Sequence, residues 1–210
     1  MLTALRRWRD RRRHGQGPWG ALLAPPPDGE WVSLDLETSG LDPARDQVLA
    51  IAAVPVRGGV IRLSERFEAV VKPPAALGID SIRHHRLRPL DLAGGLEERE
   101  AVEALLRWLG PRALIGYRIG FDAAMLDRHA AAITGFALPN PRHDLAHRWR
   151  RRDHARRPDA LAGDASFEAI AAALEVPMLA RHTALGDAVT AAACWLALEA
   201  EAAGARPRRA

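Results

Sequence analysis

The stretch WVSLDLETSGL, residues 31–41, decides the fold and the chemistry of this chain. Apolar residues alternate with other residues until Gly40, a pattern that predicts a strand running into a turn. Residues two apart on a strand share a face. Asp35 and Glu37 therefore point the same way, while the opposite face carries Val32, Leu34 and Leu36.

Two neighbouring carboxylates at a buried strand end repel each other and lose hydration. One of them then takes up a proton unless a cation lies between them, and a hard divalent metal ion is the simplest such cation. The same Asp-x-Glu spacing also occurs as two solvated surface charges. Asp35 and Glu37 thus indicate a site only if further acids and a base join them.

The composition is that of a soluble globular protein of one domain. The chain has 210 residues, of which 48% are hydrophobic and 27% charged, and this length supports one full core. Cys194 is the single cysteine, which excludes a disulfide framework and a cysteine metal site. No apolar run has the length of a signal peptide or a membrane span, so we expect a cytoplasmic protein.

Positive charge is concentrated in three segments. Residues 1–14 carry +5, residues 147–157 carry +5 and the last residues carry +3, which leaves about −9 for the rest of a chain whose net charge is +4. An acidic body with separate basic patches suits a protein that holds a metal ion beside a polyanion. Solvated helix faces would give the same pattern.

The expected domain organisation has three parts. Residues 1–29 form a basic extension, with a short amphipathic helix over 2–13 and a Pro- and Gly-rich linker without regular structure over 15–29. The helix can dock on the body, contact nucleic acid or lie on an anionic membrane surface. Residues 30–203 form the folded domain, and residues 204–210 form a basic tail.

The rest of the chain predicts an α/β fold. Strands over 48–56 and 60–71, joined at Gly58-Gly59, should pair antiparallel with the first strand. The later pattern alternates a helix over 96–109, a strand over 113–117 and helices over 121–133, 166–174 and 187–203. A loop is expected over 75–94, and Asp144 is a candidate N-cap. This order describes a mixed β-sheet flanked by helices.

Three further residues can join the first carboxylates. Asp122 lies in the first turn of a helix that follows a buried strand, and His182 and Asp187 lie where the last helix begins. A first-turn acid that complements the helix dipole is an ordinary explanation for Asp122. A surface acid and a loop histidine are ordinary explanations for the other two. Their co-occurrence at the ends of strands and the starts of helices favours a shared site.

These motifs resemble those of the DnaQ-like 3′–5′ exonucleases of the DEDDh type. The first motif is Asp35–Leu41, the second is Leu114–Asp122, and the third is His182–Ala188, with five residues from His to Asp. Two departures concern substrate contacts. Tyr117-Arg118 stands where members usually have His-Asn, and Ile82-Arg83-His84 stands in place of an Ile-His-Gly element.

The resemblance implies an RNase H-like fold, with a three-strand antiparallel meander plus parallel strands, and two bound Mg²⁺ or Mn²⁺ ions. In that arrangement Asp35 bridges the ions, Glu37 and Asp187 complete the site that activates water, and Asp122 holds the second ion through water. His182 takes the proton from the attacking water, a role that suits an imidazole near neutral pH. The substrate-binding positions implied by the family are Thr38, Ser39, Leu41 and Phe121.

A basic patch follows Asp144, an acid that the family often carries there. The patch can track a single-strand backbone while Trp149 stacks on a base, or Trp149 can pack against the domain. The patch consists of Arg148, Trp149, Arg150, Arg151 and Arg152.

The expected function is removal of 5′-mononucleotides from the 3′ end of single-stranded or frayed DNA. An exoribonuclease or oligonucleotidase is the alternative within the same class, and a catalytically silent nucleic-acid-binding module is the alternative outside it. The complete set of five catalytic-type residues argues against the silent module. A polymerase or another protein can bind through the N-terminal extension, although a stand-alone enzyme is preferred.

Overall fold

The computed structural model of the chain describes residues 2–73, 87, 89–156 and 163–204. Most of the predicted loop over 75–94, including Ile82, Arg83 and His84, lies outside the described residues. The tail beyond Gly204 lies outside them as well.

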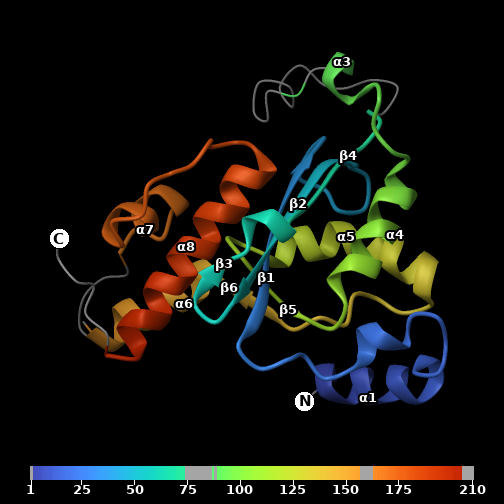
Figure 1. The fold of residues 1–210 in the computed structure, drawn as a ribbon, viewed down its shortest axis with the longest axis horizontal. Helices are drawn as coiled ribbons and strands as arrows, with labels where there is room; N and C mark the ends of the chain where they lie inside the picture. The colour runs from blue at the N-terminus through green and yellow to red at the C-terminus, as the bar shows by residue number, and fades with distance from the viewer. Residues whose placement is uncertain (1, 74–86, 88, 157–162, 205–210) are drawn as a thin grey trace.

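A six-stranded mixed sheet forms the centre of the molecule (Figure 1). β1 (Glu30–Thr38) lies in the middle of the sheet, antiparallel to β2 (Val48–Arg57) and parallel to β5 (Ala113–Gly116). The remaining strands are β3 (Val60–Ile61) and β4 (Phe67–Val70), both antiparallel to β2, and β6 (Arg142–Asp144), parallel to β5. The predicted antiparallel meander followed by parallel strands is confirmed.

The strand predicted over 60–71 is in fact two short strands. A turn of 3-10 helix, η2 (Leu63–Glu65), separates β3 from β4. It is held to β2 because Arg57 Nη2 donates to Glu65 Oε1 and Oε2 at 2.7 and 2.6 Å. β6 was not predicted, because three mostly polar residues give no periodic signal.

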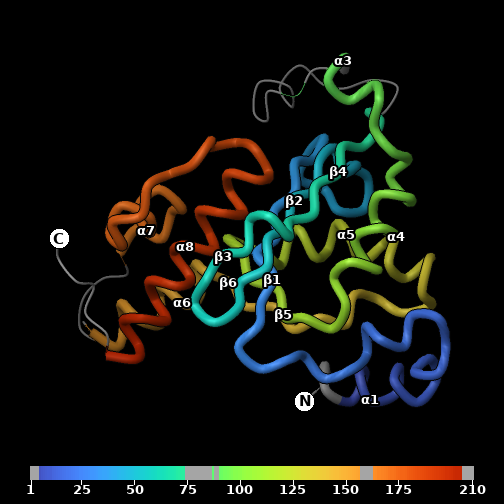
Figure 2. The backbone as a smooth tube through the Cα atoms, in the orientation of Figure 1, coloured from blue at the N-terminus to red at the C-terminus, as the bar shows by residue number. Residues whose placement is uncertain are grey.

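Helices cover both faces of the sheet (Figures 1 and 2). One face is covered by α4 (Glu98–Leu109) and α5 (Gly120–Thr134), and the other by α6 (Leu145–Arg156) and α8 (Ala184–Ala202). α7 (Phe167–Ala173) packs against α6 and α8. α3 (Pro89–Leu92) is a single turn. Within the described part of the chain, no helix is both long and apolar enough to cross a membrane.

Burial on both faces fixes how β1 is oriented. Val32, Leu34 and Leu36 belong to the core beneath α4 and α5. On the opposite face the buried Ser33 donates through Oγ to Ala188 O of α8 at 2.7 Å, which ties β1 to that helix. Because Asp35 shares the face of Ser33, the sequence alternation directs this carboxylate toward the side of α8.

The N-terminal extension packs against the domain. α1 (Leu2–His14) is followed by a turn of 3-10 helix, η1 (Gly20–Leu23), so the prediction of no regular structure over 15–29 was wrong. Leu22 and Leu23 are 2% and 1% exposed and belong to the core beneath α4 and α5. Apolar burial outweighed the Pro and Gly content of this segment.

α1 itself docks on the body, one of the three alternatives that the sequence left open. Arg7 Nη1 donates to Pro139 O at 3.1 Å, and the His14 ring lies 5.4 Å from the ring of Phe136. Leu5 and Trp8 nevertheless remain 65% and 56% exposed.

We predict that Leu23→Ala lowers the free energy of unfolding by about 2–5 kcal/mol, because it leaves a cavity in a packed core. Leu5→Ala in the same segment should change it by less than about 0.5 kcal/mol. Urea denaturation of both variants provides the comparison. Equal effects of the two substitutions would contradict the inclusion of this segment in the core.

Candidate active site

Three carboxylates from two elements converge on one small cavity. Asp35 and Glu37 come from the end of β1, and Asp187 comes from the first turn of α8. One oxygen from each lies within 4.8 Å of the others. The cavity has a volume of about 150 Å³, and its remaining lining residues are Leu36, Thr38, Arg181 and His182.

Asp122 joins the group from the other side of β1. It lies in the first turn of α5, directly after β5, and its side chain is buried. Its Oδ1 accepts a hydrogen bond from the backbone N–H of Leu36 at 3.0 Å, and its charge acts on Asp35, so this carboxylate lies beside the end of β1 that carries Asp35 and Glu37. The four predicted acids are therefore brought together.

Their electrostatics are unfavourable when the acids are all ionised. Burial, with added repulsion from Asp122, Asp187 and Glu37, raises the pKa of Asp35 well above its usual value. Burial, with repulsion from Asp187, raises the pKa of Glu37 to about 7. Burial raises the pKa of Asp122 to about 7 despite its backbone hydrogen bonds, and burial also raises the pKa of Asp187. The cluster favours either protons or bound cations.

The donor set fits a divalent cation. All the converging groups are carboxylate oxygens, the ligands that Mg²⁺ and Mn²⁺ prefer. In addition, Asp187 Oδ1 is buried and has no hydrogen-bond partner among the described residues. A buried carboxylate oxygen without a partner costs free energy, and coordination of a cation would remove that cost.

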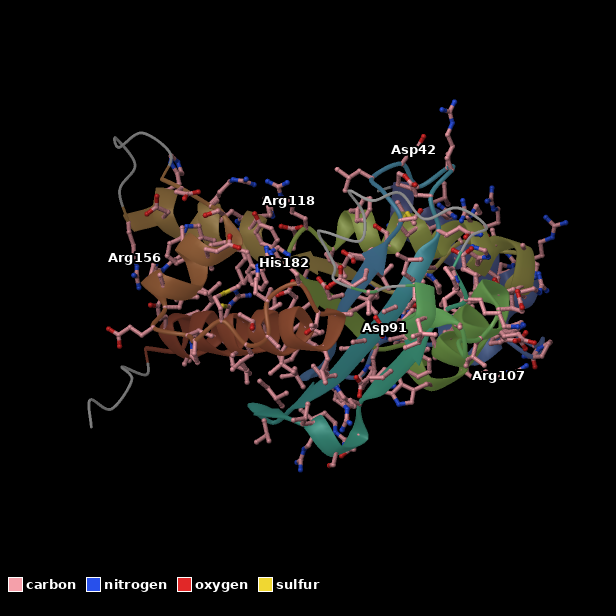
Figure 3. The ribbon with its side chains drawn as sticks, turned by 90° about the horizontal axis from the view of Figure 1, so that it is seen from above. Asp42, Asp91, Arg107, Arg118, Arg156 and His182 are labelled. Atoms are coloured by element: carbon pink, nitrogen blue, oxygen red, sulfur yellow. The ribbon has the colours of Figure 1, made fainter. Side chains whose placement is uncertain are left out.

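His182 lines the same cavity, just before α8 (Figure 3). Its backbone φ is 64°, in the left-handed region, and Ala180 also has a positive φ of 42°. Side chains disfavour this region, so the surrounding structure must hold the segment in place. The structure thus brings the predicted base to the predicted acids.

Gly186 allows this segment to lie against the first turn of α8. A Cβ atom there would be 2.1 Å from Leu179 O and 2.5 Å from Ala180 O. The N-cap Thr183 accepts a hydrogen bond from Gly186 N at 3.1 Å, which begins the helix three residues before the predicted start. Close packing at a glycine therefore fixes the position of His182 relative to Asp187.

Arg181 is a site residue that the sequence reasoning missed. Its Nη1 forms an ion pair with Asp187 Oδ2, and its Nε donates to Glu168 Oε1 at 2.8 Å. Nothing in the spacing of Arg181 and Asp187 marks the pair, because residues six apart across a helix start have no fixed geometry. The one available signal is the position of Arg181 directly before the motif histidine.

The unusual second-motif pair has a structural role. Tyr117 stacks on Phe167 of α7 with ring centroids 4.8 Å apart and an interplanar angle of 9°. Its hydroxyl donates to Ala165 O at 3.2 Å. Arg118, labelled in Figure 3, has a left-handed φ of 55°. Its guanidinium lies over the Tyr117 ring. The departure from the family pattern thus packs α7 onto the site.

Of the predicted substrate-binding residues, Thr38 lines the cavity, and the other three lie in different environments. Thr38 Oγ1 donates to Gly40 O at 2.7 Å, and Ser39 Oγ donates to Asp46 Oδ1 at 2.9 Å, so both hydroxyls hold the turn after β1. Leu41 is 85% exposed, whereas Phe121 is partly buried against the core.

Two of the four arginines of the basic patch form ion pairs. Trp149 is 7% exposed and packs in a core cluster between α6, α7 and α8, so the packing alternative holds for it. Arg148 pairs with Glu199, and Arg152 pairs with Glu201. Arg150 and Arg151 are exposed, and within the described ranges neither has an ion-pair partner.

The raised pKa values predict how stability depends on pH when EDTA removes divalent ions. Because Glu37 and Asp122 titrate near 7 in the folded chain and near 4 when unfolded, the folded state binds more protons in that window. Its free energy of unfolding therefore falls as pH rises. We expect a Tm several degrees lower at pH 7.5 than at pH 5.5.

Glu37→Gln is the control for that experiment, since the amide does not titrate. His143, whose pKa is lowered by burial, gives an opposite slope in the same window in both proteins. The fall in Tm should therefore be smaller in the variant than in the wild type. An equal or larger fall in the variant would contradict the raised pKa of Glu37.

A second prediction concerns the glycine at the start of α8. Gly186→Ala should lower the free energy of unfolding by about 1–3 kcal/mol, because the new methyl group overlaps two backbone oxygens. Gly120→Ala is the matched control, since a Cβ there meets nothing within 4 Å. It should be neutral or stabilise by up to about 1 kcal/mol. Thermal unfolding in EDTA measures both, and a tolerated Gly186→Ala would contradict the close packing.

The chain is similar in sequence to known proteins. A family model described as "Exonuclease" matches residues 32–194. The DNA polymerase III subunit epsilon of Aquifex aeolicus is 26% identical over 114 residues, which cover 54% of this chain and 55% of that protein. The PolC-type DNA polymerase III of Bacillus cereus is 30% identical over 97 residues, which cover 46% of this chain and 7% of that protein.

Solved structures agree on the fold. E. coli exonuclease I in complex with a dT13 oligonucleotide matches with a TM-score of 0.66 at 18% identity, over 82% of this chain and 41% of that one. Exonuclease I of Methylocaldum szegediense matches with a TM-score of 0.66 at 22% identity, over 82% of this chain and 40% of that one. The chain thus spans about half or less of these relatives. It belongs to the exonuclease family, which confirms the predicted resemblance to the DnaQ-like 3′–5′ exonucleases.

Proposed function

We propose that the chain removes 5′-mononucleotides from the 3′ end of single-stranded or frayed DNA with the help of two divalent ions, Mg²⁺ or Mn²⁺. One observation carries the proposal: Asp35, Glu37, Asp187 and His182 converge on a single cavity beside the end of β1, and the buried Asp122 lies close enough to repel Asp35. A catalytically silent binding module would not need this set of ionisable groups.

The chain's own residues can perform the reaction as follows. Divalent ions at such a site lower the pKa of a water molecule and neutralise charge on the leaving oxygen. Asp35, Glu37 and Asp187 would hold these ions, with Asp122 adding the fourth carboxylate. His182 would accept the proton of the attacking water from the edge of the cavity, since imidazole changes charge near neutral pH.

DNA is the favoured substrate. The relatives in sequence are DNA polymerase III proteins, and the exonuclease I structures hold dT13 and dA16 oligonucleotides. In this proposal the exposed Leu41 would contact a base, and the exposed Arg150 and Arg151 would contact phosphates of the strand. The alternative substrate, RNA, presents a 2′-hydroxyl that these contacts do not distinguish.

A protein partner stays a prediction. The exposed Leu5 and Trp8 on α1, surrounded by arginines, offer a surface of the right kind for a polymerase or another protein. The relatives named as polymerase subunits support this proposal.

The test uses DNA and RNA oligonucleotides of one sequence, labelled at the 5′ end, with Mn²⁺ or with EDTA. We expect a ladder shortening from the 3′ end of DNA, no cleavage in EDTA, and a loss of at least about 100-fold in rate for His182→Ala. His129→Ala is the matched control because His129 pairs with Glu98 in the packing between α4 and α5. It should retain cleavage if the variant folds.

Each outcome has a meaning for the proposal. Faster shortening of RNA would replace DNA by RNA as the substrate. Cleavage that persists in EDTA, or an unchanged rate in His182→Ala, would contradict the mechanism.

A further inference from the structure

We propose that Arg181 is a resident counter-ion of the acid cluster, which competes with divalent cations for Asp187 and so sets the metal affinity of the site. The inference rests on the proposed metal-dependent function and adds to it a residue that controls metal binding. It begins from the position of one guanidinium in the same cavity as the converging carboxylates.

The guanidinium contacts four groups, one of which is the imidazole of the neighbouring His182, whose Nδ1 lies 3.5 Å from Nη1. Nη1 pairs with Asp187 Oδ2, Nε donates to Glu168 Oε1 at 2.8 Å, and the guanidinium carbon lies 5.4 Å from the ring centre of Phe167. Phe167 is itself buried and stacked on Tyr117. Arg181 is thus positioned by a rigid ring and two carboxylates from different elements, which is more than a solvated surface ion pair offers.

Charge balance explains why a cation occupies this position. The cluster holds four carboxylates. Among the described residues, Arg181 offsets repulsion at Asp35, Glu37 and Asp187, and His182 adds to this effect at Asp187. A single positive charge cannot balance four acids. The cluster therefore retains attraction for a divalent ion, which leaves room for exchange between the two kinds of cation.

The Arg181 guanidinium and a divalent cation would exchange at the Asp187 carboxylate. One of its oxygens, Oδ2, pairs with Arg181, and the other, Oδ1, is buried without a hydrogen-bond partner in the part of the chain that the structure describes. A divalent ion that also contacts Asp35 and Glu37 must bind close to the guanidinium, because these carboxylates lie within 4.8 Å of one another. The two positive charges repel at that separation, so occupancy by one weakens the other.

Glu168 allows the guanidinium to release Asp187 without leaving the site. It pairs with Nε rather than Nη1, and its side chain is 58% exposed, so it can follow the arginine. When a divalent ion takes Asp187, Arg181 keeps this second carboxylate and its contact with Phe167. The cost of displacement is therefore that of one ion pair, which a well-coordinated metal ion can offset.

The experiment measures Mn²⁺ binding to the full chain by titration calorimetry without nucleic acid. Arg181→Gln should bind Mn²⁺ about threefold to thirtyfold more tightly than the wild type, since the competing charge is gone. Arg181→Lys, which keeps the charge, should stay within about threefold of the wild type. Arg181→Met, which keeps a long side chain against Phe167, should behave like Arg181→Gln and replaces it if that variant does not fold.

Arg57→Gln is the matched control. Arg57 also forms an ion pair with a glutamate, Glu65, but it lies at the far end of β2 from the acids. Its removal should leave Mn²⁺ affinity within about twofold of the wild type. In EDTA at pH 7.5, Arg181→Gln should also have a lower Tm than the wild type, and saturating Mn²⁺ should remove most of that difference.

The outcomes separate the inference from the proposed function. If the wild type binds Mn²⁺ and neither Arg181→Gln nor Arg181→Met binds it more tightly, the competition is refuted while the metal-dependent function stands. If the wild type binds no Mn²⁺, both the inference and the metal-dependent function are refuted.

Discussion

Repulsion among buried carboxylates is the constraint on which the rest of the structure depends. Asp35, Glu37, Asp122 and Asp187 come from three elements that are far apart in sequence, and burial raises the pKa of each. Such a cluster costs stability, so its persistence requires a rigid frame. The frame is the central strand β1, with helices packed on both faces of the sheet (Figure 1).

The same frame explains why the acids lie at the carboxyl ends of the central strands. β1 and β5 are parallel, so their carboxyl ends meet at one edge of the sheet, where α5 and α8 also begin. Each helix contributes an acid in its first turn, Asp122 or Asp187. Negative charge there is stabilised by the positive end of the helix dipole, which offsets part of the repulsion. Arg181 offsets another part, and cations bound from solution would offset the remainder.

Local patterns in the sequence predicted much of this arrangement, whereas contacts between distant segments did not follow from them. The alternation around Leu34 predicted β1, and the motif acids predicted the cluster. Arg181 was missed because its pairing depends on how the segment before α8 folds back at Gly186. The regular structure within residues 15–29 was not predicted, because Pro and Gly content does not show whether Leu22 and Leu23 are buried in a core. The sequence left open whether Trp149 stacks on a base or packs against the domain, because its arginine neighbours obscured the apolar spacing from Leu145.

The central claim, that this acid cluster is a divalent-cation site, is tested most directly by anomalous diffraction from crystals of the protein soaked in Mn²⁺. Our account predicts anomalous density between the carboxylates of Asp35, Glu37 and Asp187, with the guanidinium of Arg181 displaced from Asp187. Crystals at neutral pH with no anomalous density among these carboxylates, and with Arg181 still paired to Asp187 at saturating Mn²⁺, would contradict it.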